Sequence, residues 1–118
     1  MPEYKFNSIY VSVQNMKRAV EFYEKLFDRK VDKMDERYSE FEFGKFSFGL
    51  YNPNIDEVEV TYGSNSVPVF EIEDIDKEYQ RIKEFSPTVD DKILELPDMK
   101  LFQFKDTEGN ILEVYAWK

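Results

Sequence analysis

The hydrophobic pattern changes its period twice within the first fifty residues. Residues 7–13 alternate apolar and polar side chains, which is typical of a strand with one buried face. From Met16 to Phe27 the apolar residues recur every three or four positions, as on a helix with one buried side, and Asn15 stands where a cap is expected. Short strands are expected next at 30–34, 39–43 and 45–51, with Gly44 as the turn between the last two.

The same order of elements recurs in the second half of the chain. A strand is expected at 67–72, and Asp74 caps a helix with one apolar stripe, formed by Ile75, Tyr79, Ile82 and Phe85. Weak strand signals around Val89 and at 93–96 precede strands at 99–105 and 111–117, which are joined by a turn at 106–110. An offset of 59 residues relates Asn15 to Asp74, so the chain contains two βαβββ units.

These units predict an α+β fold. A helix that follows its strand packs on one face of the sheet and leaves the other face open. Two βαβββ modules would then form a cupped mixed sheet with helices outside and a cleft inside. The polar stretch 52–66, which ends in Gly63-Ser64-Asn65-Ser66, joins the modules. The length of 118 residues fits one domain, 1–118, with modules at 1–60 and 61–118.

Composition removes whole classes of chemistry. The chain has no histidine and no cysteine, which excludes a disulfide framework, a Cys/His zinc site, a cysteine nucleophile and a histidine base. The net charge of −9 argues against nucleic acid as a partner, because binding phosphates needs a basic face. No apolar run is long enough to span a membrane, and Met1–Lys5 carries no signal-peptide core. The absence of cysteine fits a reducing cytoplasm.

Two stretches carry a resemblance to a known family. The stretch IYVSVQNMKRAVEFYEKLF at 9–27 is similar to the opening strand, cap and Ala-x-x-Phe-Tyr helix of the vicinal oxygen chelate superfamily, also called the glyoxalase/bleomycin-resistance/dioxygenase fold. The stretch FKDTEGNILEV at 104–114 is similar to its closing Asp-Pro-Asp-Gly-Asn-x-x-Glu hairpin. This chain has Asp28 where the family usually has glycine after the first helix, and Thr107 where it has proline. The resemblance implies the two-module fold and, since family members commonly pair, a homodimer.

The resemblance also places four metal-ligand positions in this chain, at Ser8, Phe48, Val67 and Glu113. Only Glu113 is a usual ligand type, and one carboxylate with one hydroxyl does not make a tight divalent site. We therefore expect no metal and no cofactor. The metal-assisted isomerase, dioxygenase and thiol-transferase chemistry of the family is not expected either.

The predicted open faces provide the candidate binding residues. Counting every second residue places Glu113 with Tyr115 and Trp117, and Ser8 with Tyr10. An aromatic surface that holds carboxylates suits a small aromatic or cationic molecule. The candidate ligand-binding residues are Ser8, Tyr10, Phe48, Val67, Glu71, Glu113, Tyr115 and Trp117.

Three functions remain open at this point. The first is metal-free binding of a small molecule, such as an antibiotic or a toxin that the protein sequesters. The second is a glyoxalase-like enzyme with a degenerate metal site, in which Glu113, the best catalytic candidate, is a base or an unusual ligand, and Tyr10 or Tyr115 donates a proton. The third is an interaction domain without a ligand, whose aromatic residues simply fill its core.

Overall fold

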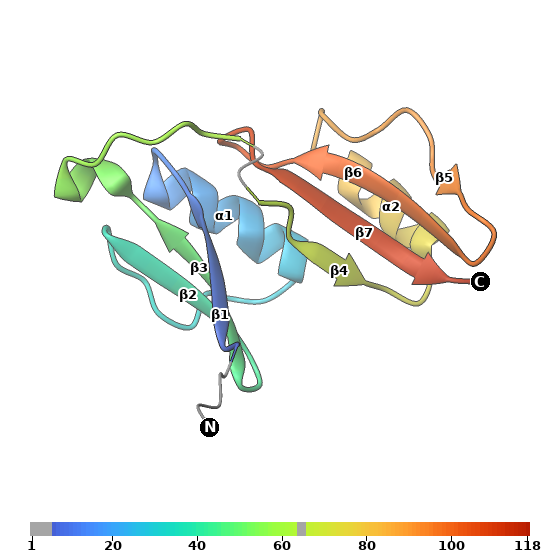
Figure 1. Cartoon of the computed structure of the whole chain (residues 1–118), viewed down its shortest axis with the longest axis horizontal. Coiled ribbons are helices and arrows are strands. Elements are labelled where there is room, and N and C mark those ends of the chain that lie inside the picture. The colour runs from blue at the N-terminus through green and yellow to red at the C-terminus, as the bar shows by residue number, and fades with distance from the viewer. Residues whose placement is uncertain (1–5, 64–65) are drawn as a thin grey trace, which may run out of the picture. The chain divides into compact units, whose positions relative to one another are not determined.

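The computed structural model describes residues 6–63 and 66–118 (Figure 1). Met1–Lys5, and Ser64 and Asn65 of the predicted polar connection, lie outside the described residues. The chain divides into two units, Met1–Thr61 and Tyr62–Lys118. Each has one α-helix and one mixed sheet, so the predicted α+β class is confirmed. In the described parts of the chain, no helix is long and apolar enough to cross a membrane.

The first unit has a sheet of three strands in the order β1-β3-β2. Strand β3 pairs in parallel with β1 on one side and antiparallel with β2 on the other. The predicted strand at 30–34 is wrong, because only one isolated bridge forms there, between Lys33 and Glu40. The elements of the unit are β1 (Ser8–Ser12), α1 (Met16–Phe27), β2 (Tyr38–Phe43), β3 (Phe46–Tyr51) and a short 3₁₀ helix, η1 (Pro53–Asp56).

Helix α1 begins and ends as its sequence predicts. The Asn15 side chain accepts a hydrogen bond from the backbone N–H of Arg18 at 3.0 Å, which satisfies one of the free N–H groups of the first turn. Asp28 follows the helix in the left-handed conformation, with φ 53°, and its N–H bonds to the carbonyl of Glu24. Aspartate tolerates this conformation better than most residues, so it replaces the glycine usual at such a position.

The core of the first unit is mainly aromatic. The ring of Tyr23 on α1 lies 5.0 Å from that of Phe48 on β3, and Phe27 lies 5.6 Å from Phe48 on another side. Tyr23, Phe41 and Leu50 are completely buried. The apolar stripe of α1 therefore packs on the face of the sheet that carries Phe41, Phe48 and Leu50.

The second unit has a sheet of four strands in the order β4-β7-β6-β5, and the pairing of β7 with β4 is again parallel. Asp74 caps α2 by accepting a hydrogen bond from the N–H of Lys77 at 3.1 Å. The strands predicted at 67–72 and 93–96 form but are shorter. The elements are β4 (Val69–Glu71), α2 (Ile75–Lys83), β5 (Leu94–Glu95), β6 (Met99–Lys105) and β7 (Ile111–Trp117).

The two units differ in the turn of their central hairpin. In the first unit Phe43 pairs with Phe46, so only two residues form the turn. In the second unit Lys105 pairs with Ile111, and the five residues between them are organised by the Asp106 carboxylate, which accepts hydrogen bonds from two backbone N–H groups at 2.8 and 2.9 Å. In both units the returning strand nevertheless begins to pair two residues after the turn glycine, Gly44 or Gly109, at Phe46 and at Ile111.

Candidate functional site

The sheet of the second unit buries one face and leaves the other open. Along β6 and β7 alternate residues are buried, and these include Phe102, Phe104, Leu112 and Val114. The residues between them remain partly exposed. We call the open surface the Glu113 face. It consists of Val69, Glu71, Leu94, Met99, Leu101, Gln103, Lys105, Ile111, Glu113, Tyr115 and Trp117.

Strand register places two polar pairs on the Glu113 face. Glu113 lies opposite Gln103 on β6, and the Gln103 amide Nε2 donates a hydrogen bond to Glu113 Oε1 at 2.9 Å. Tyr115 lies opposite Glu71 on β4, and its hydroxyl donates to Glu71 Oε1 at 2.9 Å. This hydrogen bond, together with partial burial and the charge of Glu71, raises the pKa of the Tyr115 hydroxyl. The phenol therefore keeps its proton at neutral pH.

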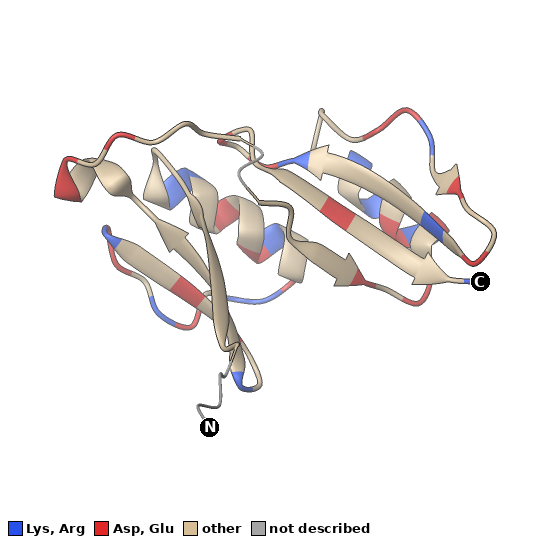
Figure 2. Cartoon of the chain, viewed as in Figure 1, with Lys and Arg blue, Asp and Glu red and all other residues tan. Residues whose placement is uncertain are grey.

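Both glutamates are held by neutral groups rather than by cations. Among the described residues, no lysine or arginine lies within ion-pair distance of Glu71 or Glu113. Figure 2 shows mixed acidic and basic residues on both helices, whereas the charged position within β7 is acidic, and Glu113 is that residue. Lys105 of β6 also lies on this face, opposite Ile111, but it pairs with neither glutamate, so their charge is available to a positively charged ligand.

An exposed indole lies on the same face at the end of β7, four residues along the strand from Glu113. Trp117 is 57% exposed, and its ring meets that of Tyr115 edge to face, with centroids 5.4 Å apart at 85°. An edge-to-face contact of this kind fixes the indole while leaving much of its surface to solvent. The Glu113 face therefore combines a flat aromatic surface with two carboxylates.

Four of the predicted site residues lie together on this face: Glu71, Glu113, Tyr115 and Trp117. Val67 precedes β4 and is 38% exposed. The sequence interpretation missed Gln103, which forms the hydrogen bond to Glu113. Its signal was present, because Gln103 and Glu113 flank the predicted turn at 106–110 at positions that pair across the hairpin.

The open face of the first unit carries tyrosines instead. The Tyr10 ring on β1 lies 6.0 Å from that of Tyr38 and 5.6 Å from that of Tyr51, both edge to face. Sequence interpretation included Tyr10 but missed the other two tyrosines. Ser8 lies beside them at a polar surface hollow of about 450 Å³, whose other residues include Ser47, Glu40 and Glu42.

The placement of Phe48 on an open face is wrong. Phe48 is 2% exposed and packs against α1. On β3 the residue opposite Tyr10 is Gly49. In the second unit Val69 corresponds to Tyr10, 59 positions later, and the residue opposite Val69 is Glu113. The parallel pairing of β3 with β1 therefore makes position 49, not 48, equivalent to Glu113, and a shift of one residue turns a side chain to the other face.

The two units also place their central glutamates on different strands. Glu40 on β2 pairs with Gly49 on β3, whereas Glu113 on β7 pairs with Gln103 on β6. Glu40 has a basic partner, because Lys33 Nζ lies 3.6 Å from Glu40 Oε2. The central acid without a cationic partner among the described residues is therefore that of the second unit.

These residues do not fit a divalent metal. Of the four positions at which the family binds metal, the structure places Ser8 and Gly49 in the first unit and Val67 and Glu113 in the second. They supply one carboxylate and one hydroxyl, and Gln103 already occupies one oxygen of the carboxylate. Mg²⁺ and Ca²⁺ need several oxygen ligands. In residues 6–63 and 66–118, no group of three or more acidic side chains is arranged to hold a metal.

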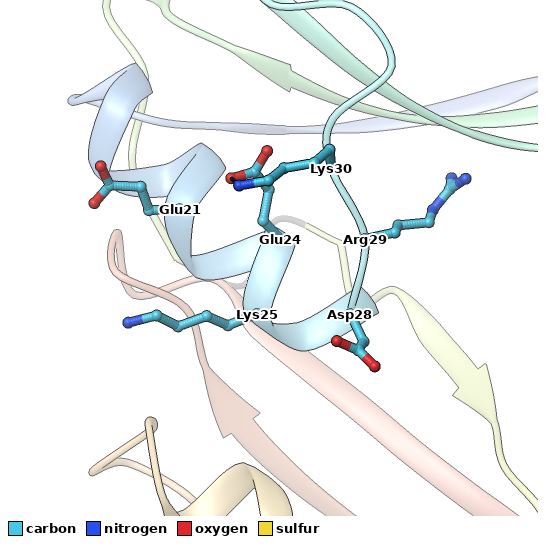
Figure 3. Close-up of a pocket in the computed structure, with 6 residues that line it drawn as sticks. All are labelled: Glu21, Glu24, Lys25, Asp28, Arg29 and Lys30. Carbon is cyan, nitrogen blue, oxygen red and sulfur yellow. Dashed lines mark ion pairs between the residues drawn. The ribbon is translucent and has the colours of Figure 1, made fainter.

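A hollow of about 460 Å³ at the end of α1 is lined by six charged residues (Figure 3). The Glu24 carboxylate accepts a hydrogen bond from the N–H of Val31 at 3.0 Å, and Lys30 Nζ lies 4.0 Å from its other oxygen. In Figure 3 Glu21 and Lys25 extend to one side of the helix, whereas Arg29 extends to the other. These charges stabilise the chain where it leaves the helix and do not converge on a ligand.

In the first unit, hydrogen bonds to the Asp56 carboxylate make the stability of the fold depend on pH. The Asp56 carboxylate accepts from the Tyr51 hydroxyl at 2.8 Å and from Arg37 Nε at 2.9 and 3.1 Å. The Tyr51 hydrogen bond and the guanidinium lower the pKa of Asp56 below its ordinary value of 3.8. Because this pKa is lower in the folded chain, these bonds stabilise the fold above the unfolded pKa, and their contribution is lost as pH falls through the folded pKa.

We therefore expect the native chain to lose more stability on acidification than Asp56→Asn does. The difference should develop between about pH 5 and pH 2. Urea denaturation at each pH measures it. Parallel stability curves for the two proteins would show that Asp56 has the same pKa folded and unfolded.

Comparisons with solved structures show the same fold. A lactoylglutathione lyase from Agrobacterium tumefaciens is 16% identical, with a TM-score of 0.75 over 98% of this chain and 96% of that one. A glyoxalase/bleomycin resistance protein/dioxygenase from Nocardioides is 15% identical, with a TM-score of 0.77 over 99% and 85%. A glyoxalase-related enzyme from Fulvimarina pelagi is 12% identical, with a TM-score of 0.79 over 95% and 87%.

No curated protein matches the sequence. The family model of the Glyoxalase/Bleomycin resistance protein/Dioxygenase superfamily matches residues 5–114, nearly the whole chain. The closing hairpin and the opening strand and helix that suggested this family both lie within the matched residues. The chain belongs to the Glyoxalase/Bleomycin resistance protein/Dioxygenase superfamily.

Proposed function

We propose that this protein binds a small cationic aromatic molecule on the Glu113 face without the help of a metal. One observation carries the proposal: two carboxylates, held by neutral donors, lie on an open sheet face that also carries a largely exposed indole. Lys105 lies on the same face but forms no ion pair with Glu71 or Glu113, so neither carboxylate is neutralised by a cation of the described residues and both can pair with a positive ligand.

Each part of the face has a physical role in such binding. A flat cation stacks on Trp117 and gains cation–π attraction from the indole, while Glu113 and Glu71 pair with its charge. Tyr115 and Gln103 hold the two carboxylates in place before the ligand arrives, so less rotational entropy is lost on binding. The net charge of −9 favours cations over anions from a distance.

Trp117 gives a direct measurement, since it is the only tryptophan of the chain. We expect its fluorescence to change saturably on titration with benzamidinium, benzylammonium or another small aromatic cation. Benzoate, an aromatic anion of similar size, should leave it unchanged. An equal response to benzoate would contradict the proposal.

Glu113→Gln should weaken the binding of the aromatic cation that binds best by about tenfold, because hydrogen bonds to charged groups contribute about 1.5–3 kcal/mol. The matched control is Glu42→Gln, which removes one charge from the exposed end of β2 in the other unit. That control should retain nearly native affinity. Equal affinities of Glu113→Gln and the native chain would overturn the proposal.

The enzyme hypothesis has less support from the geometry. It requires a proton donor such as Tyr115, yet the Tyr115 hydroxyl already donates to Glu71 and its pKa is raised, which makes it a weaker acid. The hypothesis of a ligand-free interaction domain would gain support if no aromatic cation changed the Trp117 fluorescence.

A further inference from the structure

The two neutral hydrogen-bond donors beside the glutamates of the Glu113 face are directed at those glutamates. An ionised carboxylate only accepts hydrogen bonds, so the group of Gln103 that faces Glu113 must be the amide nitrogen. The proton of the Tyr115 hydroxyl is likewise directed at Glu71. Both neutral donors therefore point along the sheet, to carboxylates of the neighbouring strands.

Beside the two glutamates the groups left for a ligand are acceptors, while the ammonium of Lys105 and the indole N–H of Trp117 lie at opposite ends of the face. Once Oε1 of each glutamate is occupied, the second oxygens of Glu113 and Glu71 and the side-chain carbonyl of Gln103 have no partner among the described residues. Glu71 lies two residues along β4 from Val69, the partner of Glu113, so the two carboxylates are diagonal neighbours. Diagonal neighbours lie about 7–8 Å apart, close enough for one ligand to reach both.

A row of acceptors discriminates between two kinds of cation. A quaternary ammonium has no N–H, so it can satisfy none of these oxygens and would remove water from them without replacing the lost hydrogen bonds. A guanidinium or amidinium carries several N–H groups in one plane. It can form bidentate hydrogen bonds with a carboxylate and can stack on aromatic rings. Trp117 supplies such a ring on the same face, in contact with Tyr115.

We propose, building on the proposed function, that the ligand of the Glu113 face carries a planar cation with several N–H groups, an amidinium or a guanidinium, attached to a flat ring. Glu113 and Glu71 accept its hydrogen bonds. The amide of Gln103 positions Glu113 and adds its carbonyl as a further acceptor.

Two probes of equal charge separate this class from other cations. Benzamidinium and trimethylanilinium each carry one positive charge on a phenyl ring, but only benzamidinium has N–H groups. We expect benzamidinium to bind the native chain at least about tenfold more tightly, measured by Trp117 fluorescence and by calorimetry. The difference corresponds to about 1.4 kcal/mol, within the range for hydrogen bonds to charged groups.

The outcomes distinguish this inference from the function on which it rests. If trimethylanilinium binds as tightly as benzamidinium and both need Glu113, the inference fails while the proposed function stands. If no aromatic cation binds, or if binding does not need Glu113, the proposed function fails as well.

Gln103→Leu tests the positioning role. It should weaken benzamidinium binding about fivefold and leave trimethylanilinium binding unchanged, because only the first probe uses the acceptors that Gln103 provides and orients. An equal loss for both probes would show that the substitution acts by disturbing the sheet, and would overturn this role of Gln103. Thermal unfolding of the variant, compared with that of Glu42→Gln, gives an independent measure of such a disturbance.

Discussion

Phe48→Ala is expected to lower the free energy of unfolding by about 3–5 kcal/mol, the range for a fully buried phenylalanine. Phe48 is 2% exposed, and its ring contacts Tyr23 at 5.0 Å and Phe27 at 5.6 Å between ring centroids. Removing it leaves a cavity between α1 and β3 that these neighbours can fill only in part. Urea denaturation measures the loss, with the slope of the transition showing whether unfolding remains two-state.

Tyr10→Ala is the matched control, since Tyr10 is an aromatic residue on a neighbouring strand but is 52% exposed on the opposite face. Its loss should be about 1 kcal/mol, mainly from its contacts with two other tyrosines. Should Phe48→Ala fail to fold, Phe48→Leu keeps most of the apolar volume and should fall between the two. A loss for Phe48→Ala no larger than that for Tyr10→Ala would mean that Phe48 lies on the open face after all.

Gly49→Ala is expected to destabilise the chain by about 1–3 kcal/mol, as overpacking usually does. A Cβ atom built on Gly49 would lie 2.0 Å from the hydroxyl oxygen of Tyr38 and 2.3 Å from the ring carbon that bears it. The Tyr38 ring therefore lies over this glycine and must move away to admit a methyl group. Its contact with Tyr10, at 6.0 Å between centroids, would be lost with it.

A double-mutant cycle isolates this cause. In a Tyr38→Ala background the space over Gly49 is empty, so Gly49→Ala should cost little there or even stabilise β3, since alanine suits a strand better than glycine. Denaturation of the four proteins gives the coupling between the two positions. Equal costs of Gly49→Ala in both backgrounds would show that something other than the Tyr38 ring requires glycine.

The Gly49 contact also explains why the two open faces differ. At equivalent positions, the first unit has a glycine covered by its own Tyr38, and the second has Glu113 with one carboxylate oxygen free of partners among the described residues. The first unit therefore fills this position with its own side chain, whereas the second offers a charge to a ligand. The two units therefore share a fold, but their open faces differ in chemistry.

Local sequence signals predicted the helices most reliably. Asn15 and Asp74 both cap the helices that their positions indicated, and Asp28 adopts the left-handed conformation expected after α1. Such features depend on a few neighbouring residues, so an isolated stretch of sequence contains the whole cause. The segment at 30–34 has strand-like residues but only one bridge, because a strand also needs a partner edge with a matching register.

The sequence alone determined the family, the two-unit order of elements, and the grouping of Glu113 with Tyr115 and Trp117, because period and turn residues act along the chain. Tertiary structure decided which side chains meet across strands. The pairing of β3 with β1 placed Gly49 rather than Phe48 on the open face, and hairpin pairing brought Gln103 to Glu113. The physical reason is that register is set by the pairing of whole strands, and a slip of one residue reverses every side chain.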